Sequence, residues 1–146
     1  MVNGINHITF AVRDLDKSLA FYQKVLGLSV AAVWAEGAYL QAGSTWIALN
    51  LDLQADTKPP CQCSHIAFHV EKKDFDPLAE RIRRSGATIW QENKSEGASL
   101  YFTDPDCHKL EIHASDLAAR LYAMELDPPK GYTAIFQTDV TRAAGA

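Results

Sequence analysis

The heptapeptide SHIAFHV at residues 64–70 nearly repeats an earlier one, NHITFAV at residues 6–12. In both, a polar residue is followed by His-Ile, a small residue, Phe and, two positions later, Val. Apolar residues alternate with other residue types, which is typical of a β-strand with one buried face. A repeat of this kind indicates two copies of one structural unit.

The same order of elements follows each heptapeptide. An aspartate (Asp14 or Asp16 in the first half, Asp74 in the second) is expected to cap a helix, and a glycine (Gly27, Gly86) is expected to end it. Three further strands come after each glycine. The sequence therefore predicts an α+β fold built from two paired βαβββ modules.

The predicted division of the chain follows from this repeat. Residues 1–53 form the first module, residues 54–60 a linker, residues 61–114 the second module and residues 115–146 a C-terminal helix and tail. The linker is polar and contains two prolines, which favours an extended connection.

Composition limits the classes of partner. The 146 residues carry a net charge of −4, which gives no reason to expect nucleic acid or an anionic membrane as partner. No apolar run is long enough to span a membrane, and the N-terminus lacks the layout of a signal peptide. The three cysteines are an odd number, so we expect reduced thiols in the cytoplasm.

Strand alternation gives a candidate metal site. His7, His65 and Glu111 fall on the strand faces opposite the apolar residues, so we expect them to converge in one cavity. Two imidazoles and a carboxylate form a ligand set that leaves positions open for a substrate. For a lone histidine we would favour an ordinary half-buried strand residue, but two at equivalent positions of a repeat favour a metal. His69 and His113 share this face, and no role is assigned to either.

Longer phrases carry a family resemblance. They are WAEGAYLQAGSTWIAL (34–49), NKSEGASLYFTDPD (93–106), HKLEIH (108–113) and LAARL (117–121). With the two heptapeptides they resemble the vicinal oxygen chelate superfamily, and within it the fosfomycin-resistance thiol transferases of the Mn(II)- and K⁺-dependent glutathione type. The resemblance implies a cup-shaped mixed sheet in a domain-swapped homodimer, where His7 of one chain meets His65 and Glu111 of the other.

The resemblance also implies an activity, namely the addition of glutathione to the epoxide carbon of fosfomycin, with Mn²⁺ or another divalent metal and K⁺ as cofactors. The family's catalytic positions match Thr9, Tyr39 and Arg120. Its substrate-binding positions match Trp46, Lys94, Ser95, Ser99, Tyr101 and Arg120. Its potassium loop matches Asn93, Ser95, Gly97 and Ser99, and its thiol channel matches Trp34, Glu36, Asn50 and Gln91. Without the resemblance, these would be strand or core residues, a polar hairpin and a solvated helix charge.

Several positions depart from the glutathione type, among them Gln91, Cys107 and Glu36. Gln91 stands where that type has a lysine, which removes a cation from an anion site. Cys107 replaces a glycine in a turn. Glu36 falls where a related hydrolase branch has a glutamate that activates water as a general base. Epoxide hydrolysis with Glu36 as base is therefore one alternative, and a non-catalytic antibiotic-binding paralogue is another.

Overall fold

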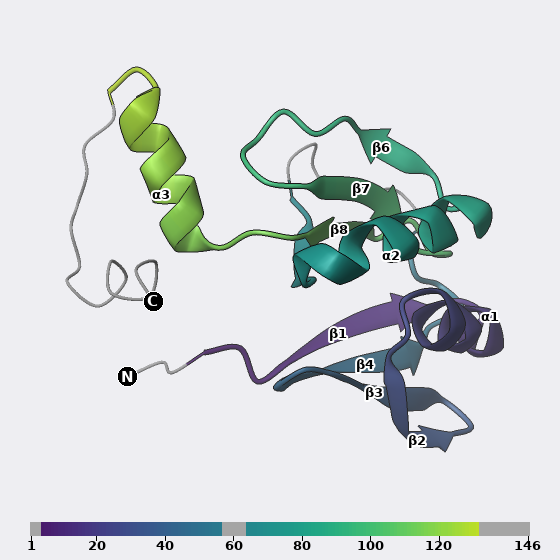
Figure 1. Ribbon diagram of the computed structural model, residues 1–146. Helices are drawn as coiled ribbons and strands as arrows, with labels where there is room; N and C mark the ends of the chain where they lie inside the picture. Colours follow the sequence, from purple (N-terminus) through teal and green to yellow (C-terminus); the bar gives the residue numbers. More distant parts are fainter. Residues whose placement is uncertain (1–3, 57–63, 132–146) are drawn as a thin grey trace.

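The computed structural model describes residues 4–56 and 64–131. Two four-stranded sheets each carry a helix on one side, and the helices lie between the sheets (Figure 1). This confirms the predicted α+β class and the two βαβββ modules. Within the described ranges, no helix has the length and apolarity needed to cross a membrane.

The first module contains β1 (His7–Val12), α1 (Leu15–Ala20), the π-helical turn η1 (Phe21–Val25), β2 (Ser29–Trp34), β3 (Gly37–Ala42) and β4 (Thr45–Leu51). The strand order is β1-β4-β3-β2, with β1 parallel to β4 and the other pairs antiparallel. The predicted cap is confirmed at Asp14, whose side chain accepts a hydrogen bond of 2.9 Å from the Lys17 amide.

The second module contains β5 (Ile66–His69), α2 (Lys72–Arg84), β6 (Ile89–Gln91), β7 (Ser99–Thr103) and β8 (Lys109–His113), in the order β5-β8-β7-β6. The expectation that Asp74 caps α2 is wrong. The helix begins earlier, after Glu71, so Asp74 lies within its first turn. A carboxylate there still interacts favourably with the positive end of the helix dipole.

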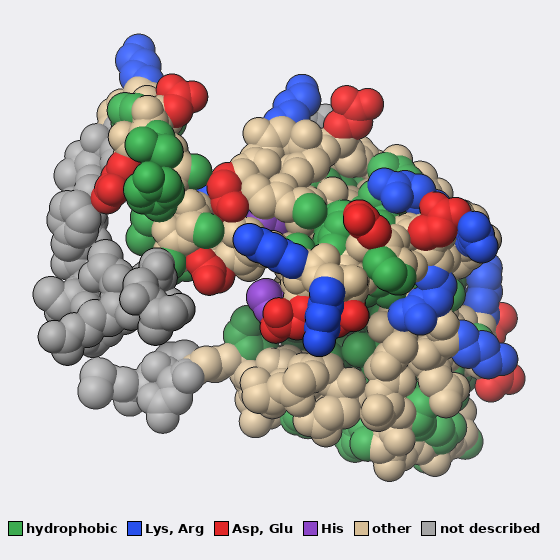
Figure 2. Space-filling model, in the orientation of Figure 1, with side chains coloured by type: hydrophobic (Ala, Val, Ile, Leu, Met, Phe, Trp, Pro, Cys, Tyr) green, Lys and Arg blue, Asp and Glu red, His purple; other side chains and the backbone are tan. Residues whose placement is uncertain are grey.

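Helix α3 (Leu117–Leu126) follows β8 and stands apart from the two modules in Figure 1. Leu117, Tyr122 and Leu126 are exposed, and Figure 2 shows apolar side chains on the surface of this helix. Residues 57–60 of the predicted linker and the predicted tail from residue 132 onward lie outside the described residues.

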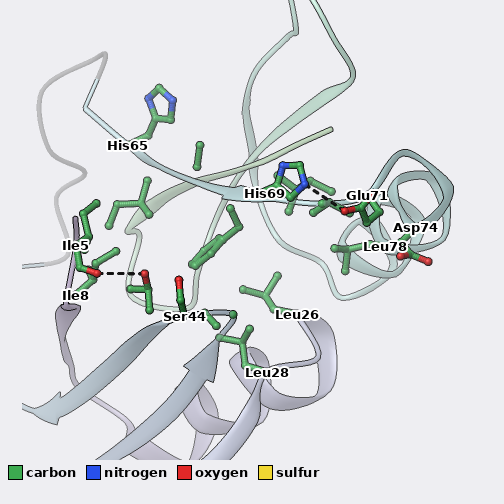
Figure 3. Close-up of a pocket in the computed structure, with 18 residues that line it drawn as sticks. Ile5, Ile8, Leu26, Leu28, Ser44, His65, His69, Glu71, Asp74 and Leu78 are labelled. Carbon is green, nitrogen blue, oxygen red and sulfur yellow. Dashed lines mark hydrogen bonds and ion pairs between the residues drawn. The ribbon is translucent and has the colours of Figure 1, made fainter. Parts of the chain in front are cut away.

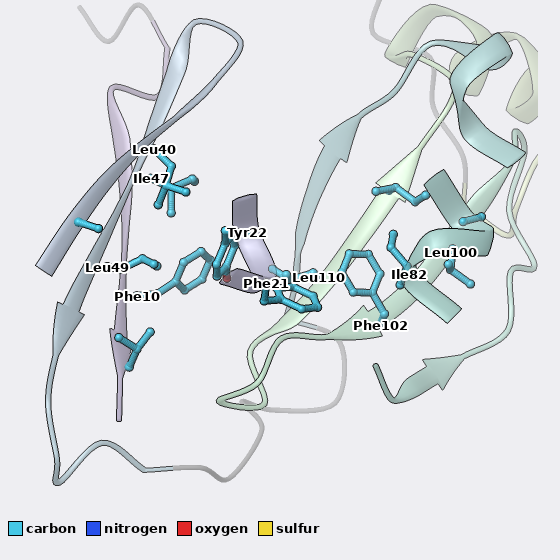
Figure 4. Close-up of a cluster of buried hydrophobic side chains, with 14 residues drawn as sticks. Phe10, Phe21, Tyr22, Leu40, Ile47, Leu49, Ile82, Leu100, Phe102 and Leu110 are labelled. Carbon is cyan, nitrogen blue, oxygen red and sulfur yellow. The ribbon is translucent and has the colours of Figure 1, made fainter. Parts of the chain in front are cut away.

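The two modules share one hydrophobic core (Figure 4). Phe10 and Leu49 come from the first sheet, Phe102 and Leu110 come from the second, and all four are buried. Phe21 bridges them, with its ring centroid 6.3 Å from that of Phe102. Because the apolar faces of both sheets meet in this core, the other face of each sheet points away from it.

Two buried carboxylates in the turn between β7 and β8 bind the first module. The Asp104 carboxylate accepts a hydrogen bond of 2.9 Å from the Tyr22 hydroxyl and lies 2.7 Å from Nδ1 of His108. The Asp106 carboxylate accepts one of 2.9 Å from the Ser18 hydroxyl. These bonds fix the orientation of one module against the other, because buried polar groups are costly to leave without partners.

Burial, together with the negative charge of Asp104, raises the pKa of Tyr22 well above its usual value. The folded chain therefore keeps this proton at a pH where the unfolded chain has lost it, so the free energy of unfolding falls as pH rises above about 10. Tyr22→Phe should lower the free energy of unfolding by about 1–3 kcal/mol at neutral pH. Between neutral pH and about pH 10.5, the free energy of unfolding of the wild type should fall by about 1 kcal/mol more than that of Tyr22→Phe. Urea unfolding at both pH values measures this, and an equal loss in both proteins would contradict it.

Cys107 has a positive φ of 69°, a conformation that costs about 1–2 kcal/mol for residues with a Cβ. Cys107→Gly should therefore exceed Cys107→Ala in free energy of unfolding by about 1 kcal/mol. Both variants lose the thiol, and only the alanine keeps the Cβ, so the pair isolates the backbone effect. Equal urea midpoints for the two variants would show that this turn is not strained.

Candidate active site in two halves

The outer face of the first sheet carries a row of aromatic rings, one from each strand. His7 of β1 stacks on Trp46 of β4 with centroids 4.3 Å apart. The ring centroid of Tyr39 on β3 lies 4.5 Å from that of Trp46 and 4.7 Å from that of Trp34 on β2. We call this row the aromatic half-site. It contains a predicted metal ligand, His7, beside residues predicted for catalysis, substrate binding and the thiol channel.

Strand register places further predicted residues on this face. Thr9 pairs with Ala48, which pairs with Tyr39, so Thr9 and Tyr39 lie in one row. Asn50 pairs with Gly37, and the indole of Trp34 covers Gly37 so closely that it leaves no room for a Cβ there. Glu36 is exposed in the turn between β2 and β3. The aromatic half-site thus includes Thr9, Asn50 and, at its rim, Glu36.

The outer face of the second sheet carries the carboxylate half-site, centred on Glu111 of β8. This residue is 5% exposed, and its Oε2 lies 2.8 Å from Nε2 of His65. Its Oε1 accepts a hydrogen bond of 2.6 Å from the Ser99 hydroxyl. Tyr101, opposite Glu111 in the ladder, meets the His65 ring edge-on at 5.6 Å. Four predicted site residues are therefore in contact here.

Sequence reasoning missed two neighbours of this half-site. The Trp90 ring lies 5.7 Å from that of His65 and 5.3 Å from that of Tyr101, and Nζ of Lys109 lies 4.7 Å above Trp90. The register shifts between Ile89 and Gln91, so simple alternation does not predict where Trp90 points. Lys109 lies two residues before Glu111 on β8, so alternation places both on this face.

The predicted potassium loop is closed by Asn93. Its Oδ1 accepts hydrogen bonds of 3.0 Å from both the amide and the hydroxyl of Ser95, and its Nδ2 donates one of 2.7 Å to the Gly97 carbonyl. Gly97 has φ of +80°, and a Cβ there would lie 2.6 Å from that of Ser115. Ser99, the fourth predicted member, instead directs its hydroxyl to Glu111.

Arg120 is tied to this loop by Glu96, a residue that sequence reasoning missed. The Arg120 Nε lies 3.9 Å from the Glu96 carboxylate, which also accepts a hydrogen bond of 2.8 Å from the Ser115 hydroxyl. Lys94 and Gln91 are exposed near the same loop. Arg120 of α3 and Lys94 of this loop, two cationic residues predicted for an anionic substrate, therefore both lie at this end of the second module.

The two half-sites do not meet within one chain. His7 contacts Asn6, with 2.7 Å between Nδ1 and Oδ1, and residues 4–56 and 64–131 contain no group of three His, Cys, Asp or Glu placed to hold a metal. Within one chain His7 lies apart from His65 and Glu111, because both half-sites face away from the shared core. Their convergence across two chains stays a prediction.

A cavity of about 750 Å³ opens between the edge strands β1 and β5 (Figure 3). Its lining is mostly apolar and includes Ile5, Ile8 and Leu78, with His69 and Glu71 at one end. Of the predicted site residues it includes only His65. The cavity therefore adjoins the carboxylate half-site but does not contain it.

His65 and Glu111 fit a divalent metal ion. Two ligands in adjacent positions, each about 2.1 Å from one ion, lie about 3 Å apart, which is close to the observed 2.8 Å between Nε2 and Oε2. Both are ligand types that Zn²⁺, Fe²⁺ and Mn²⁺ accept. Together they supply two of the ligands that a site needs.

Comparison with known proteins agrees with this geometry. The profile of the Glyoxalase/Bleomycin resistance protein/Dioxygenase superfamily matches residues 4–112, and the chain belongs to this superfamily. It is 47% identical to glutathione transferase FosA from Serratia marcescens over 141 residues, which cover 95% of this chain and 99% of that protein. It is 42% identical to metallothiol transferase FosB from Shouchella clausii, with 88% and 92% covered.

Solved structures of fosfomycin resistance proteins also resemble this chain. The fosfomycin resistance protein FosX from Listeria monocytogenes superposes with a TM-score of 0.74 at 29% identity, covering 84% of this chain and 99% of that one. A variant of that protein was solved with Mn(II) and 1S,2S-dihydroxypropylphosphonic acid, with a TM-score of 0.72 at 28% identity and the same coverage. The resemblance to fosfomycin-resistance thiol transferases is thus confirmed.

Proposed function

We propose that this protein is a metal-dependent fosfomycin-resistance enzyme that adds glutathione to the epoxide carbon of the drug. The observation that carries the proposal is the contact between His65 and the buried Glu111 on the outer face of the second sheet, in a chain 47% identical to a glutathione transferase. We propose Mn(II) as the metal and K⁺ in the Asn93 loop. We place the reaction in the cytoplasm, where glutathione is abundant and thiols stay reduced.

The reaction forms a bond between the thiolate sulfur and an epoxide carbon, breaks the carbon–oxygen bond and leaves a hydroxyl once the oxygen takes up a proton. A divalent cation would supply Lewis-acid stabilisation of the developing negative charge. Thr9 would donate a hydrogen bond to the departing oxygen, and Tyr39 would orient the sulfur. The rings of Trp46 and Trp34 would shield the epoxide and the thiol from water.

The phosphonate of fosfomycin is anionic and needs cationic or hydroxyl partners. We propose that Ser95, Tyr101 and Arg120 bind it, with Lys94 adding positive charge. Arg120 would exchange its 3.9 Å contact with Glu96 for the phosphonate. Gln91 supplies no charge, so we expect weaker binding of drug or thiol than with a lysine there.

We further propose that the active enzyme is a swapped homodimer, in which the aromatic half-site of one chain covers the carboxylate half-site of the other. Two observations support this arrangement. Both half-sites face away from the core of their own chain, and β1 and β5 are the edge strands of their sheets beside the cavity. A second chain could also cover α3, which buries no residue of its own.

Water addition is the second candidate function. Glu36 is an exposed carboxylate at the rim of the aromatic half-site, and the FosX variant was solved with a dihydroxypropylphosphonic acid. In the dimer, Glu36 could remove a proton from water that attacks the epoxide. The identity to FosA and FosB favours the thiol as the main nucleophile.

Incubation with Mn²⁺, K⁺, glutathione and fosfomycin should give the glutathione adduct as the main product. ³¹P NMR of the reaction mixture measures the adduct. Glu36→Gln should leave adduct formation intact and remove any diol that accompanies it. A diol as the main product would replace thiol transfer by hydrolysis. Tight drug binding in EDTA with no product would instead indicate a binding protein.

Mixing two inactive variants tests the swapped dimer. His7→Ala and Glu111→Gln should each be inactive alone, because each damages every metal site. After the two are unfolded and refolded together, half of the dimers are mixed, and each mixed dimer has one intact site. Activity should therefore return to about a quarter of the wild-type value.

The matched control mixes His65→Ala with Glu111→Gln. These two residues come from the same half-site, so every site in a mixed dimer keeps one damaged ligand. No activity should return. Failure of the first mixture to recover, with both variants folded and dimeric, would rule out a site shared in this way.

A further inference from the structure

Ser99 and His113 lie beside Glu111 on the outer face of the second sheet, and His113 has no role in the proposed chemistry. The Ser99 hydroxyl lies 2.6 Å from Oε1 of Glu111 and 2.7 Å from Nδ1 of His113. Ser99 and His113 are opposite each other in the β7–β8 ladder, and Glu111 lies two residues along β8. The three side chains therefore form a continuous chain on rigid strands.

Hydrogen-bond chemistry gives this chain a direction. An ionised carboxylate only accepts hydrogen bonds, and a serine hydroxyl has a single proton to donate. If Ser99 donates that proton to Glu111, Nδ1 of His113 must carry a proton and donate it to Ser99. One tautomer of His113 thus fixes the hydroxyl, and the hydroxyl fixes one carboxylate oxygen.

Packing holds the His113 ring in place. Its side chain is 16% exposed, and the backbone of Gly97 approaches so closely that an added Cβ would lie 3.0 Å from the ring Cε1. With Oε1 occupied by Ser99, only Oε2 of Glu111 remains on the His65 side, where the metal would bind.

We propose that His113 and Ser99 are positioning residues that hold Glu111 in the orientation required for metal binding. The inference rests on the proposed function, since it takes His65 and Glu111 as metal ligands. Hydrogen-bonded groups behind a metal ligand typically change metal affinity by about 10- to 100-fold when removed. We expect an effect of this size for both residues.

The test compares two variants of nearly the same shape. His113→Asn keeps a donor nitrogen near the place of Nδ1, and His113→Leu replaces it by a methyl group. His113→Leu and Ser99→Ala should each weaken Mn(II) binding about 10- to 100-fold, and the double variant no more than either alone, because both break one chain. His113→Asn should bind Mn(II) nearly as well as the wild type. Electron paramagnetic resonance titration without substrate measures the affinity.

His69→Phe is the matched control. His69 pairs with His113 in the β5–β8 ladder, but its side chain is 64% exposed and lies 3.6 Å from Glu71. It should bind Mn(II) like the wild type.

Circular dichroism and urea unfolding of the metal-free proteins show whether each variant is folded. Folded His113→Leu and Ser99→Ala proteins with wild-type affinity would overturn the inference while leaving the proposed enzyme intact. Equal weakening in His113→Asn and His113→Leu would overturn it too, because the donor would then not matter. A wild-type protein that binds no Mn(II) would overturn both the inference and the proposed metal site.

Discussion

Each sheet of this protein has one apolar face, and both apolar faces are used in a single core. That constraint decides where chemistry can occur. Phe10 and Leu49 must face Phe102 and Leu110 to be buried, so the alternate residues on the same strands must face away from the core. The histidines, the carboxylate and the aromatic rings are therefore presented on two outer surfaces. Either surface alone lacks part of the predicted site.

The turn between β7 and β8 keeps these surfaces in a fixed relation. Asp104 and Asp106 are buried and take hydrogen bonds from Tyr22 and Ser18 of the other module. Tyr22 reaches Asp104 from the π-helical turn η1. Such departures from regular helix geometry often occur where a specific contact is needed. Because buried polar groups without partners are costly, sliding one module against the other would sacrifice these bonds. The hydrogen bonds of Asp104 and Asp106 thus fix the orientation of the two modules, whereas burial of the apolar core gives most of the stability.

The fold could be predicted because its signals are local. Alternation in NHITFAV and SHIAFHV defines the strands, and Asp14 begins a helix where expected. The site was predictable only in part. Which residues share a face follows from alternation, as for Glu111 with Tyr101, but the separation of His7 from Glu111 depends on how the modules pack, which no local pattern encodes. Trp90 was missed because a register shift breaks the alternation, and Glu96 because its contacts lie on a distant segment.

Glu111 explains why a half-site can exist before any metal arrives. A buried carboxylate is unstable unless its charge is compensated. In the single chain, His65 serves one oxygen and Ser99 the other. A cation entering between Oε2 of Glu111 and Nε2 of His65 would replace only the first contact. The Ser99 contact would persist. If Glu111 binds metal as proposed, it would keep one orientation with and without the ion, and little of the binding energy would be lost in rearranging it.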